Sequence, residues 1–203
     1  MSSKKGFSRR GFLQGAGIGG VLGTGLLEQQ ASAAGGGATV AGPGAVPVTL
    51  KVNGKSVHLT IEPRVTLSEA LRNELDLTGS KRVCDRGTCG ACTVLIDGKP
   101  VYSCSVLAID AQDRSIQTIE GMTSADALHP ISQAFWENDG QQCGYCTSGF
   151  VVASKALLDE HPNPTEEEII RGLSGNICRC GSYQGIRAAA LEAAKNIRGG
   201  KNA

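Results

Sequence analysis

The sequence predicts an α+β fold, in which a small mixed β-sheet crossed by one helix is followed by a bundle of four helices. Three observations predict it. In the first half, short runs of apolar residues alternate with a period of two and are separated by glycine-containing turns. In the second half, apolar residues recur at helical spacing. Each half also carries its own set of four cysteines.

The N-terminal segment is predicted to be an export signal and not part of the fold. Arg9 and Arg10 precede an uncharged, glycine-rich stretch over residues 11–27, and an A-x-A cleavage pattern follows at residues 31–33. The paired arginines resemble the twin-arginine signal, which implies export of a folded protein to the periplasm. Glycine makes the stretch a poor membrane span, so a short membrane anchor is the weaker alternative. We therefore expect residues 1–33 to be removed.

The composition predicts a linker and argues against a nucleic-acid-binding protein and against a membrane-inserted one. Residues 34–46 are rich in glycine, alanine and proline, and we expect them to form a flexible linker. The formal net charge of the chain is +1, which argues against a broad basic surface for nucleic acid. No stretch is apolar enough over the length of a membrane span, so stable membrane insertion is not expected.

The first half, residues 47–120, is predicted to have a β-grasp layout. Hairpin turns of the Asn-Gly and Asp-Gly types are expected at residues 53–54 and 97–98. Thr66 begins a capping box with the glutamate three residues later, which starts a helix over residues 66–75. The predicted strands cover residues 48–52, 56–61, 94–96, 101–102 and 116–119.

The second half, residues 121–203, is predicted to be a four-helix bundle. A proline after His129 marks the start of the first helix. Thr165 begins a second capping box, and Ser182 or Gln184 starts the last helix. Short connections between the helices favour a bundle. The predicted helices cover residues 131–138, 149–159, 168–173 and 185–198.

The eight cysteines fall into two sets, one in each half. The first set has the spacing C-x4-C-x2-C-x11-C and the second has the spacing C-x2-C-x31-C-x-C. The first set consists of Cys84, Cys89, Cys92 and Cys104, and the second of Cys143, Cys146, Cys178 and Cys180.

Disulfides, zinc sites and iron–sulfur clusters are the three uses that these cysteines could have. An exported protein favours disulfides, but Cys178-Arg179-Cys180 leaves too little chain for good disulfide geometry. Two structural zinc sites would also use four thiolates each. The first spacing is the plant-type [2Fe-2S] pattern, and Gly87 and Gly90 would let backbone N–H groups turn toward sulfur. The spacing favours iron–sulfur, with zinc and disulfides as alternatives.

Three motifs carry a family resemblance. CDRGTCGACTVLIDG, QQCGYCTSG and GNICRCGSYQGI, in that order, resemble the iron–sulfur subunit of the molybdenum hydroxylase (xanthine oxidase) family. The resemblance covers residues 47–197 and is specific, because both cysteine sets have the family's spacing. With its leader, the short chain is most similar to the iron–sulfur subunits of periplasmic aldehyde oxidoreductases.

The resemblance implies two [2Fe-2S] clusters, one in a plant-type ferredoxin domain of β-grasp fold and one in the helical domain. It implies an oxidoreductase subunit with no catalytic residue of its own, since the chemistry takes place on a partner. It also implies that all the cysteines are cluster ligands: Cys84, Cys89, Cys92 and Cys104 for the first cluster, and Cys143, Cys146, Cys178 and Cys180 for the second.

The resemblance implies partners as well. A large subunit would bind molybdopterin, expected in its cytosine dinucleotide form, close to Gln142 and Cys180. A medium subunit would bind FAD near the first cluster, so that electrons pass from molybdenum to flavin within a heterotrimer. Ser148 and Gly181 stand where many members have proline and threonine, and these departures concern cluster potential and cofactor contacts, not ligation.

Two other functions remain as alternatives. The chain could be a freestanding ferredoxin-type carrier, which would expose both clusters to transient partners. It could also be the small subunit of an N-heterocycle hydroxylase or of a carbon monoxide dehydrogenase. This sequence does not indicate the substrate, because the substrate pocket would lie on another polypeptide.

Overall fold

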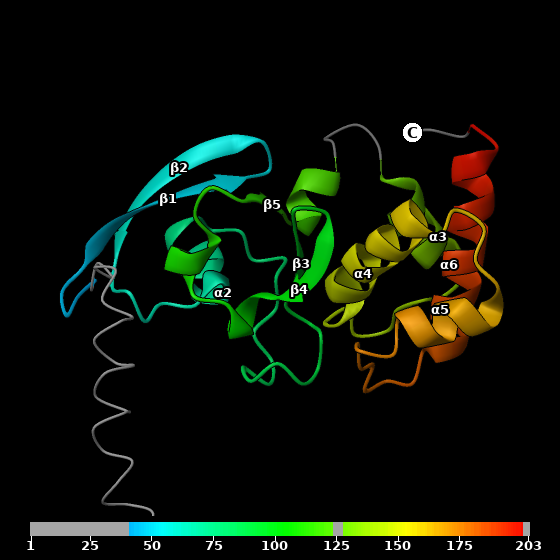
Figure 1. Cartoon of the computed structure of the whole chain (residues 1–203). Helices are drawn as coiled ribbons and strands as arrows, with labels where there is room; N and C mark the ends of the chain where they lie inside the picture. Colours follow the sequence, from blue (N-terminus) through cyan, green and yellow to red (C-terminus); the bar gives the residue numbers. More distant parts are fainter. Residues whose placement is uncertain (1–40, 124–127, 201–203) are drawn as a thin grey trace, which may run out of the picture. The chain divides into compact units, whose positions relative to one another are not determined.

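The structure describes residues 41–123 and 128–200 of the chain (Figure 1). This part contains a mixed sheet of five strands and five α-helices, which are labelled α2 to α6. The structure is a computed structural model. The predicted signal over residues 1–33 lies outside the described residues, as do residues 34–40 of the predicted linker and residues 124–127. The predicted α+β class is confirmed.

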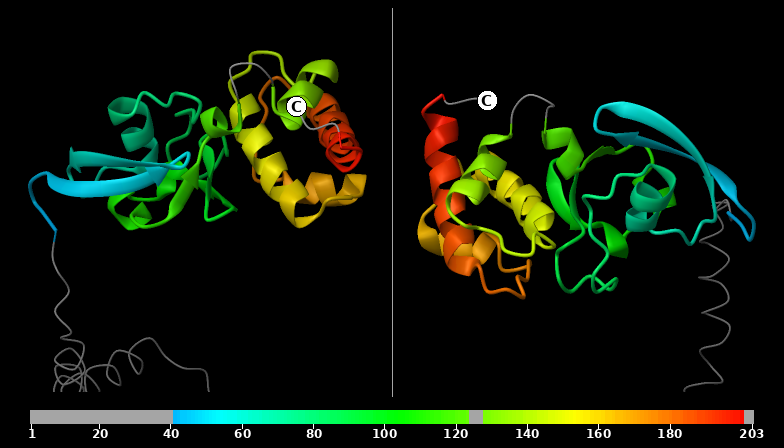
Figure 2. Two further views of the ribbon diagram at one scale, coloured as in Figure 1. Left: turned by 90° about the horizontal axis from the view of Figure 1, so that it is seen from above. Right: turned by 180° about the vertical axis from the view of Figure 1, so that it is seen from behind.

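The sheet has the strand order β2-β1-β5-β3-β4, in which β1 and β5 are parallel and all other neighbours are antiparallel (Figure 2). All five predicted strands are present, and the predicted turns at residues 53–54 and 97–98 join β1 to β2 and β3 to β4. Both residues of each turn have positive φ, as such two-residue hairpin turns require. The strands are β1 (Val46–Val52), β2 (Lys55–Ile61), β3 (Thr93–Ile96), β4 (Lys99–Tyr102) and β5 (Ser115–Gln117).

The helix of the first half begins at its predicted capping box. The Thr66 side chain accepts a hydrogen bond from the Glu69 backbone N–H, and the Glu69 side chain accepts one from the Thr66 backbone N–H. Helix α2 (Leu67–Glu69) then passes into a π-helical stretch, Ala70–Glu74, which the sequence did not predict. The apolar residues of this segment line the hydrophobic core beneath the sheet.

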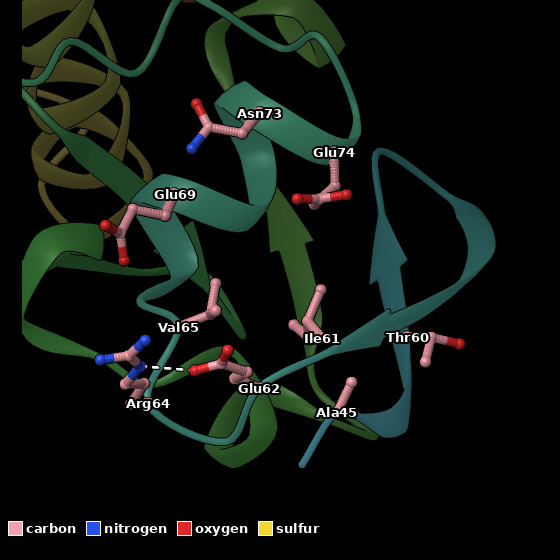
Figure 3. Close-up of a pocket in the computed structure, with 9 residues that line it drawn as sticks. All are labelled: Ala45, Thr60, Ile61, Glu62, Arg64, Val65, Glu69, Asn73 and Glu74. Carbon is pink, nitrogen blue, oxygen red and sulfur yellow. Dashed lines mark hydrogen bonds and ion pairs between the residues drawn. The ribbon is translucent and has the colours of Figure 1, made fainter.

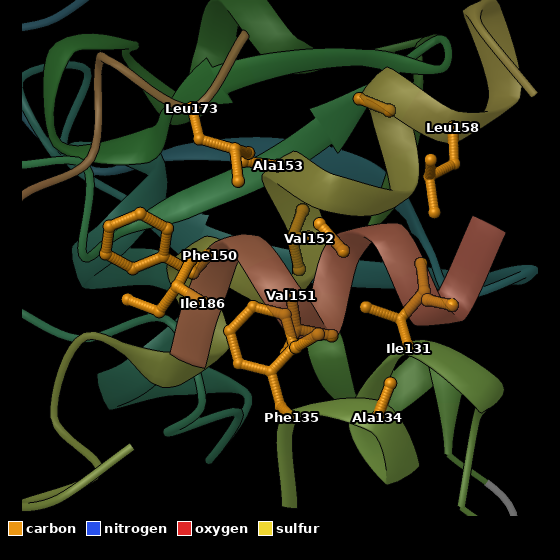
Figure 4. Packing of buried hydrophobic residues seen from close by; sticks show 14 of the residues in the cluster. Ile131, Ala134, Phe135, Phe150, Val151, Val152, Ala153, Leu158, Leu173 and Ile186 are labelled. Atoms are coloured by element: carbon orange, nitrogen blue, oxygen red, sulfur yellow. The ribbon is translucent and has the colours of Figure 1, made fainter. Parts of the chain in front are cut away.

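The second half contains the four predicted helices, with ends that differ by two residues at most. His129 caps the first of them, because its side chain accepts from the Ile131 backbone N–H, and the predicted Thr165 capping box is present. The helices surround a second core that includes Phe135, Phe150 and Ile186 (Figure 4). Among the described residues, no helix has the length and apolar character needed to cross a membrane. The helices are α3 (Pro130–Glu137), α4 (Thr147–Glu160), α5 (Glu166–Gly172) and α6 (Tyr183–Arg198).

Strand β3 connects the two cores because it is buried on both faces. Val94 and Ile96 belong to the core beneath α2, whereas Leu95 between them belongs to the helical core. Successive side chains of a strand point to opposite faces, so one strand serves both. Helix α4 packs against β3 and β4 and also contacts α3, α5 and α6. The described residues from Gly42 onward belong to one compact unit, within which the loop that carries Cys89 and the loop that carries Cys178 are hydrogen-bonded to each other.

Candidate metal centres

The first cysteine set lies on the loop that precedes β3 and on the short turn that follows β4. Cys92 and Cys104 are buried, whereas Cys84 and Cys89 are half-buried. None of the eight cysteines of the chain, all of which lie in the described part, forms a disulfide in this structure. The first set therefore has a buried side and a side nearer to solvent.

Backbone N–H groups point at the sulfur atoms of the first set, as the sequence predicts. The Gly87 N–H donates to Cys104 Sγ at 3.2 Å, and the Thr88 N–H donates to Cys84 Sγ at 3.4 Å. Gly87 has a φ of +68°, and a Cβ at this position would lie 2.6 Å from Ser105 Oγ. Such a loop favours negatively charged sulfur, which is what a thiolate-bound cluster presents.

The thiols of the first set interact through side-chain hydrogen bonds in two pairs, Cys84 with Cys89 and Cys92 with Cys104. Burial disfavours the ionised form of Cys84, but hydrogen bonds from the Arg86 and Thr88 N–H groups and from Cys89 outweigh it and lower its pKa to about 6. Burial raises the pKa of Cys92 to about 11, and its neighbour Cys104 adds to that effect.

The second set has the same arrangement in pairs. The Cys143 side chain interacts with that of Cys180, and the Cys146 side chain with that of Cys178. Cys143 and Cys180 are exposed, whereas Cys178 is buried. Burial, together with the hydrogen bond to Cys178, raises the pKa of the Cys146 thiol to about 12. One pair of the second set thus lies at the surface and the other lies deeper.

Pairs of thiols fit a binuclear cluster better than a single zinc ion. A [2Fe-2S] cluster is held by four cysteines, two on each iron, whereas zinc gathers four thiolates around one point at about 2.3 Å. In the first set, the thiol pairs and the N–H groups aimed at sulfur both fit a [2Fe-2S] cluster, and in the second set the thiol pairs fit one.

The loop that carries Cys178 is held by the start of α6. The Cys178 backbone N–H donates to Tyr183 Oη at 2.9 Å, and the Tyr183 ring stands edge-on to Phe150 with ring centroids 6.4 Å apart. Neither aromatic residue was expected from the sequence to have a role at the site. Their spacing along the chain gives no signal, because the contact depends on how α4 packs against α6.

The structure places Gln142 in an exposed position next to exposed Cys143, and Cys180 interacts with Cys143. The two residues assigned to a molybdopterin contact thus lie on either side of one exposed thiol. Ser148 donates from Oγ to the Gly79 carbonyl at 2.6 Å, a hydrogen bond that proline could not make. The departure at this position therefore has a structural role.

An open groove of about 690 Å³ lies elsewhere, over the β1–β2 ribbon and the helix of the first half (Figure 3). It carries several carboxylates and an ion pair between Arg64 and Glu62 at 2.5 Å. No cysteine lines it, so it has no part in the candidate metal centres. Its lining residues are Ala45, Thr60, Ile61, Glu62, Arg64, Val65, Glu69, Asn73 and Glu74.

Comparison with known proteins identifies the family. The 2Fe-2S iron-sulfur cluster binding domain family matches residues 50–129, and the [2Fe-2S] binding domain family matches residues 118–191. The iron-sulfur-binding subunit of an aldehyde oxidoreductase from Escherichia coli O157:H7 is 47% identical over 171 residues, which cover 77% of this chain and 75% of the relative. The chain belongs to the iron–sulfur subunits of the molybdenum hydroxylase family.

Other members of the molybdenum hydroxylase family resemble the chain almost as well. The nicotine 6-hydroxylase small subunit of Paenarthrobacter nicotinovorans is 45% identical over 157 residues, which cover 77% of this chain and 94% of the relative. Among solved structures, quinoline 2-oxidoreductase of Pseudomonas putida 86 matches with a TM-score of 0.73 and 38% identity, over 77% of this chain and 98% of that chain. The aldehyde oxidoreductase of Desulfovibrio desulfuricans matches with a TM-score of 0.73 and 41% identity, over 75% of this chain and 17% of that longer chain. As in this family generally, the chain is an oxidoreductase subunit that transfers electrons, and catalysis belongs to another subunit.

Proposed function

We propose that the chain is the electron-transfer subunit of a periplasmic, molybdenum-dependent aldehyde oxidoreductase. It carries electrons from a molybdopterin centre on a large subunit through two [2Fe-2S] clusters to FAD on a medium subunit. The observation that carries this proposal is the arrangement of the eight thiols, which form two pairs in each half with backbone N–H groups aimed at sulfur in the first. In this proposal a β-grasp domain of ferredoxin type, residues 47–120, holds one cluster, and a four-helix domain, residues 121–203, holds the other.

When bound, each [2Fe-2S] cluster supplies a carrier of single electrons. The chain contributes the environment of that carrier. Hydrogen bonds from Gly87 and Thr88 to sulfur stabilise negative charge on the ligands of the first set. Burial of Cys92 and Cys178 keeps water from part of each site. The proposed ligands are Cys84, Cys89, Cys92 and Cys104 for the first cluster, and Cys143, Cys146, Cys178 and Cys180 for the second.

Exposed apolar residues beside the cysteines favour a permanent partner over a freestanding carrier. Val83, Tyr145 and Ile177 each adjoin a cysteine of the two sets, and they are 55%, 51% and 47% exposed. We propose that a partner subunit covers these three side chains. We propose that the large subunit brings molybdopterin, in its cytosine dinucleotide form, to Gln142 and Cys180, and that the complex is a heterotrimer.

The reaction proposed for the complex converts an aldehyde and water into a carboxylic acid, with two protons and two electrons released. The similarity to aldehyde oxidoreductase subunits from two sources supports this choice. A nicotine hydroxylase small subunit is almost equally similar, at 45% against 47% identity, so hydroxylation of an N-heterocycle is the second candidate. Assay of the natively purified complex with aldehydes and with N-heterocycles separates the two.

Replacing Gln142 with alanine tests the proposed orientation toward molybdopterin. The change leaves all eight thiols in place, and Gln142 is exposed, so we expect both cluster spectra to persist. Molybdenum content, or the rate at which electrons enter the clusters from substrate, should fall. Gln141→Ala, which changes an equally exposed neighbour of the same type, is the matched control. Unchanged molybdenum content and turnover in Gln142→Ala would contradict the orientation.

Replacing Arg9 and Arg10 with lysine tests the proposed location. The twin-arginine signal is read by its arginine pair, so the charge-preserving change should hold the protein inside the cell with both clusters assembled. Fractionation of cells, followed by immunodetection and iron analysis of each fraction, checks this. Normal delivery of the variant to the periplasm would rule out the twin-arginine interpretation, whereas the Lys4→Arg variant should be exported normally.

A further inference from the structure

We propose that Asn176 is a positioning residue for electron transfer between the two clusters, because it holds the loop of Cys178 in hydrogen-bonded register with the loop of Cys89. The proposal rests on the proposed function, since it supposes that both sets carry clusters. It concerns residues 175–177 and their contacts with the first half, which neither the cysteine spacing nor the family comparison assigns a role.

Two hydrogen bonds join the two loops directly, and a third joins the Cys178 loop to β4. Asn176 Nδ2 donates to the Gly90 carbonyl at 2.8 Å, and the Ile177 N–H donates to the Cys89 carbonyl at 2.9 Å. Tyr102 Oη donates to the Gly175 carbonyl at 2.7 Å. These contacts join residues 73 to 88 positions apart in the chain, and the bond between Ile177 and Cys89 joins a cysteine of the first set to the residue next to a cysteine of the second.

The hydrogen bond between the Ile177 N–H and the Cys89 carbonyl completes a short through-bond route between the two sets. Cys89 belongs to the first set, and Ile177 immediately precedes Cys178 of the second set. One hydrogen bond therefore separates the backbone of one proposed ligand from the residue bonded to another. With both clusters bound, Cys89 and Cys178 would each hold one of them, and this route would serve the passage of single electrons between the two sets.

Asn176 is placed to fix that hydrogen bond. Its side chain is buried, at 7% exposure, and Nδ2 also lies 3.3 Å from Thr93 Oγ1. Thr93 Oγ1 in turn donates to the Gly90 carbonyl at 2.6 Å, so the amide sits in a closed network on the first half. A buried hydrogen-bond network of this kind restricts the side chain to few geometries. Because Ile177 is the next residue, the position of Asn176 sets where the Ile177 N–H points.

The surrounding backbones leave no room for another arrangement. A Cβ at Gly90 would lie 2.6 Å from Asn176 Nδ2 and 2.7 Å from the Gly175 carbonyl oxygen. A Cβ at Gly149, on α4, would overlap the Gly90 carbonyl oxygen. Two glycines thus allow the loops and α4 to approach closely enough for Asn176 to reach its acceptor.

The test uses the natively purified complex and three readouts in the Asn176→Ala variant. These are the magnetic interaction between the two reduced clusters by electron paramagnetic resonance, the rate of electron transfer between them after rapid one-electron reduction, and amide hydrogen exchange of the peptide that contains Ile177. We expect loss of the magnetic splitting, slower transfer and loss of protection at Ile177. The optical spectra of both clusters and both reduction potentials should stay as in the unmodified protein.

Asn138→Ala is the matched control, because Asn138 Nδ2 also donates two hydrogen bonds, to the Ala134 carbonyl at 2.9 Å and to the Glu192 carboxylate, and neither partner belongs to the Cys89 or the Cys178 loop. Both alanine variants should lower the Tm by about 4–8 °C, the shift expected for a loss of two hydrogen bonds in a chain of this size. Only Asn176→Ala should change the coupling. Equal loss of Tm with unchanged splitting, transfer rate and exchange in Asn176→Ala would overturn the proposal.

If the alanine variant fails to retain both clusters, the Asn176→Asp variant provides a second test of the proposal. It keeps the size of the side chain but replaces the donor facing the Gly90 carbonyl with a carboxylate oxygen. With both clusters present, it should show the same loss of splitting, and normal splitting would again overturn the proposal. A separate outcome tests the proposed function: an unmodified complex without two reducible clusters would contradict that function itself, before any variant is compared.

Discussion

A chain in which serine replaces Cys89 is expected to hold about two irons instead of about four, because one of the two [2Fe-2S] clusters is lost. Cys89 is half-buried and paired with Cys84, so its loss leaves Cys84 without the second thiol of its pair. The helical half has its own hydrophobic core, and it should keep its cluster. Electron entry from substrate should then continue, while transfer onward to the flavin acceptor should stop.

Iron and sulfide analysis, with electron paramagnetic resonance of the reduced protein, checks this result. Cys143→Ser is the matched control, because it removes one exposed ligand of the other set and should abolish the other signal. Circular dichroism should accompany both variants, since cluster binding also contributes to folding. Loss of all iron from either single variant would contradict two independent sites, and an unchanged iron content would contradict ligation by the cysteine replaced.

Replacing Phe150 with alanine is expected to lower the free energy of unfolding by about 3–5 kcal/mol. The Phe150 side chain is 1% exposed and lies in the core between α4 and α6 (Figure 4). Its ring packs edge-on against that of Tyr183. The change removes a large buried side chain and leaves a cavity. For a domain of this size, that loss corresponds to a fall in Tm of about 6–20 °C.

Thermal unfolding of the cluster-loaded protein measures the effect of Phe150→Ala. Trp136 is 65% exposed, so Trp136→Ala should cost less than about 0.5 kcal/mol and serves as the aromatic control. Tyr183 also accepts from the Cys178 N–H, so Phe150→Ala should in addition broaden the signal of the second cluster. Equal Tm values for the two variants would contradict the packing described for α4 and α6.

Features governed by neighbouring residues could be predicted from the sequence. The hairpin at Asn53-Gly54 needs only two residues that tolerate positive φ, and both have it. The capping boxes at Thr66 and Thr165 each depend on residues three positions apart. The π-helical stretch after α2 could not be predicted in the same way, because a capping box determines only the first turn and packing on the sheet determines the rest.

At the candidate site too, the local features could be predicted from the sequence and the long-range contacts could not. The spacing of the cysteines predicts two sets of four, and Gly87 takes the predicted role of turning its N–H toward sulfur. The sequence does not show that Asn176 reaches Gly90, since the two residues are 86 positions apart and meet only after α4 packs against β3. Contacts of that kind depend on tertiary packing, so no local sequence pattern predicts them.

The most direct test of the account is metal analysis of the natively purified, unmodified protein. Two four-cysteine sets with thiols in pairs predict about four irons and about four acid-labile sulfides per chain, with two distinguishable paramagnetic signals after reduction. Zinc in place of iron, in a protein without visible absorption, would contradict the assignment of both centres.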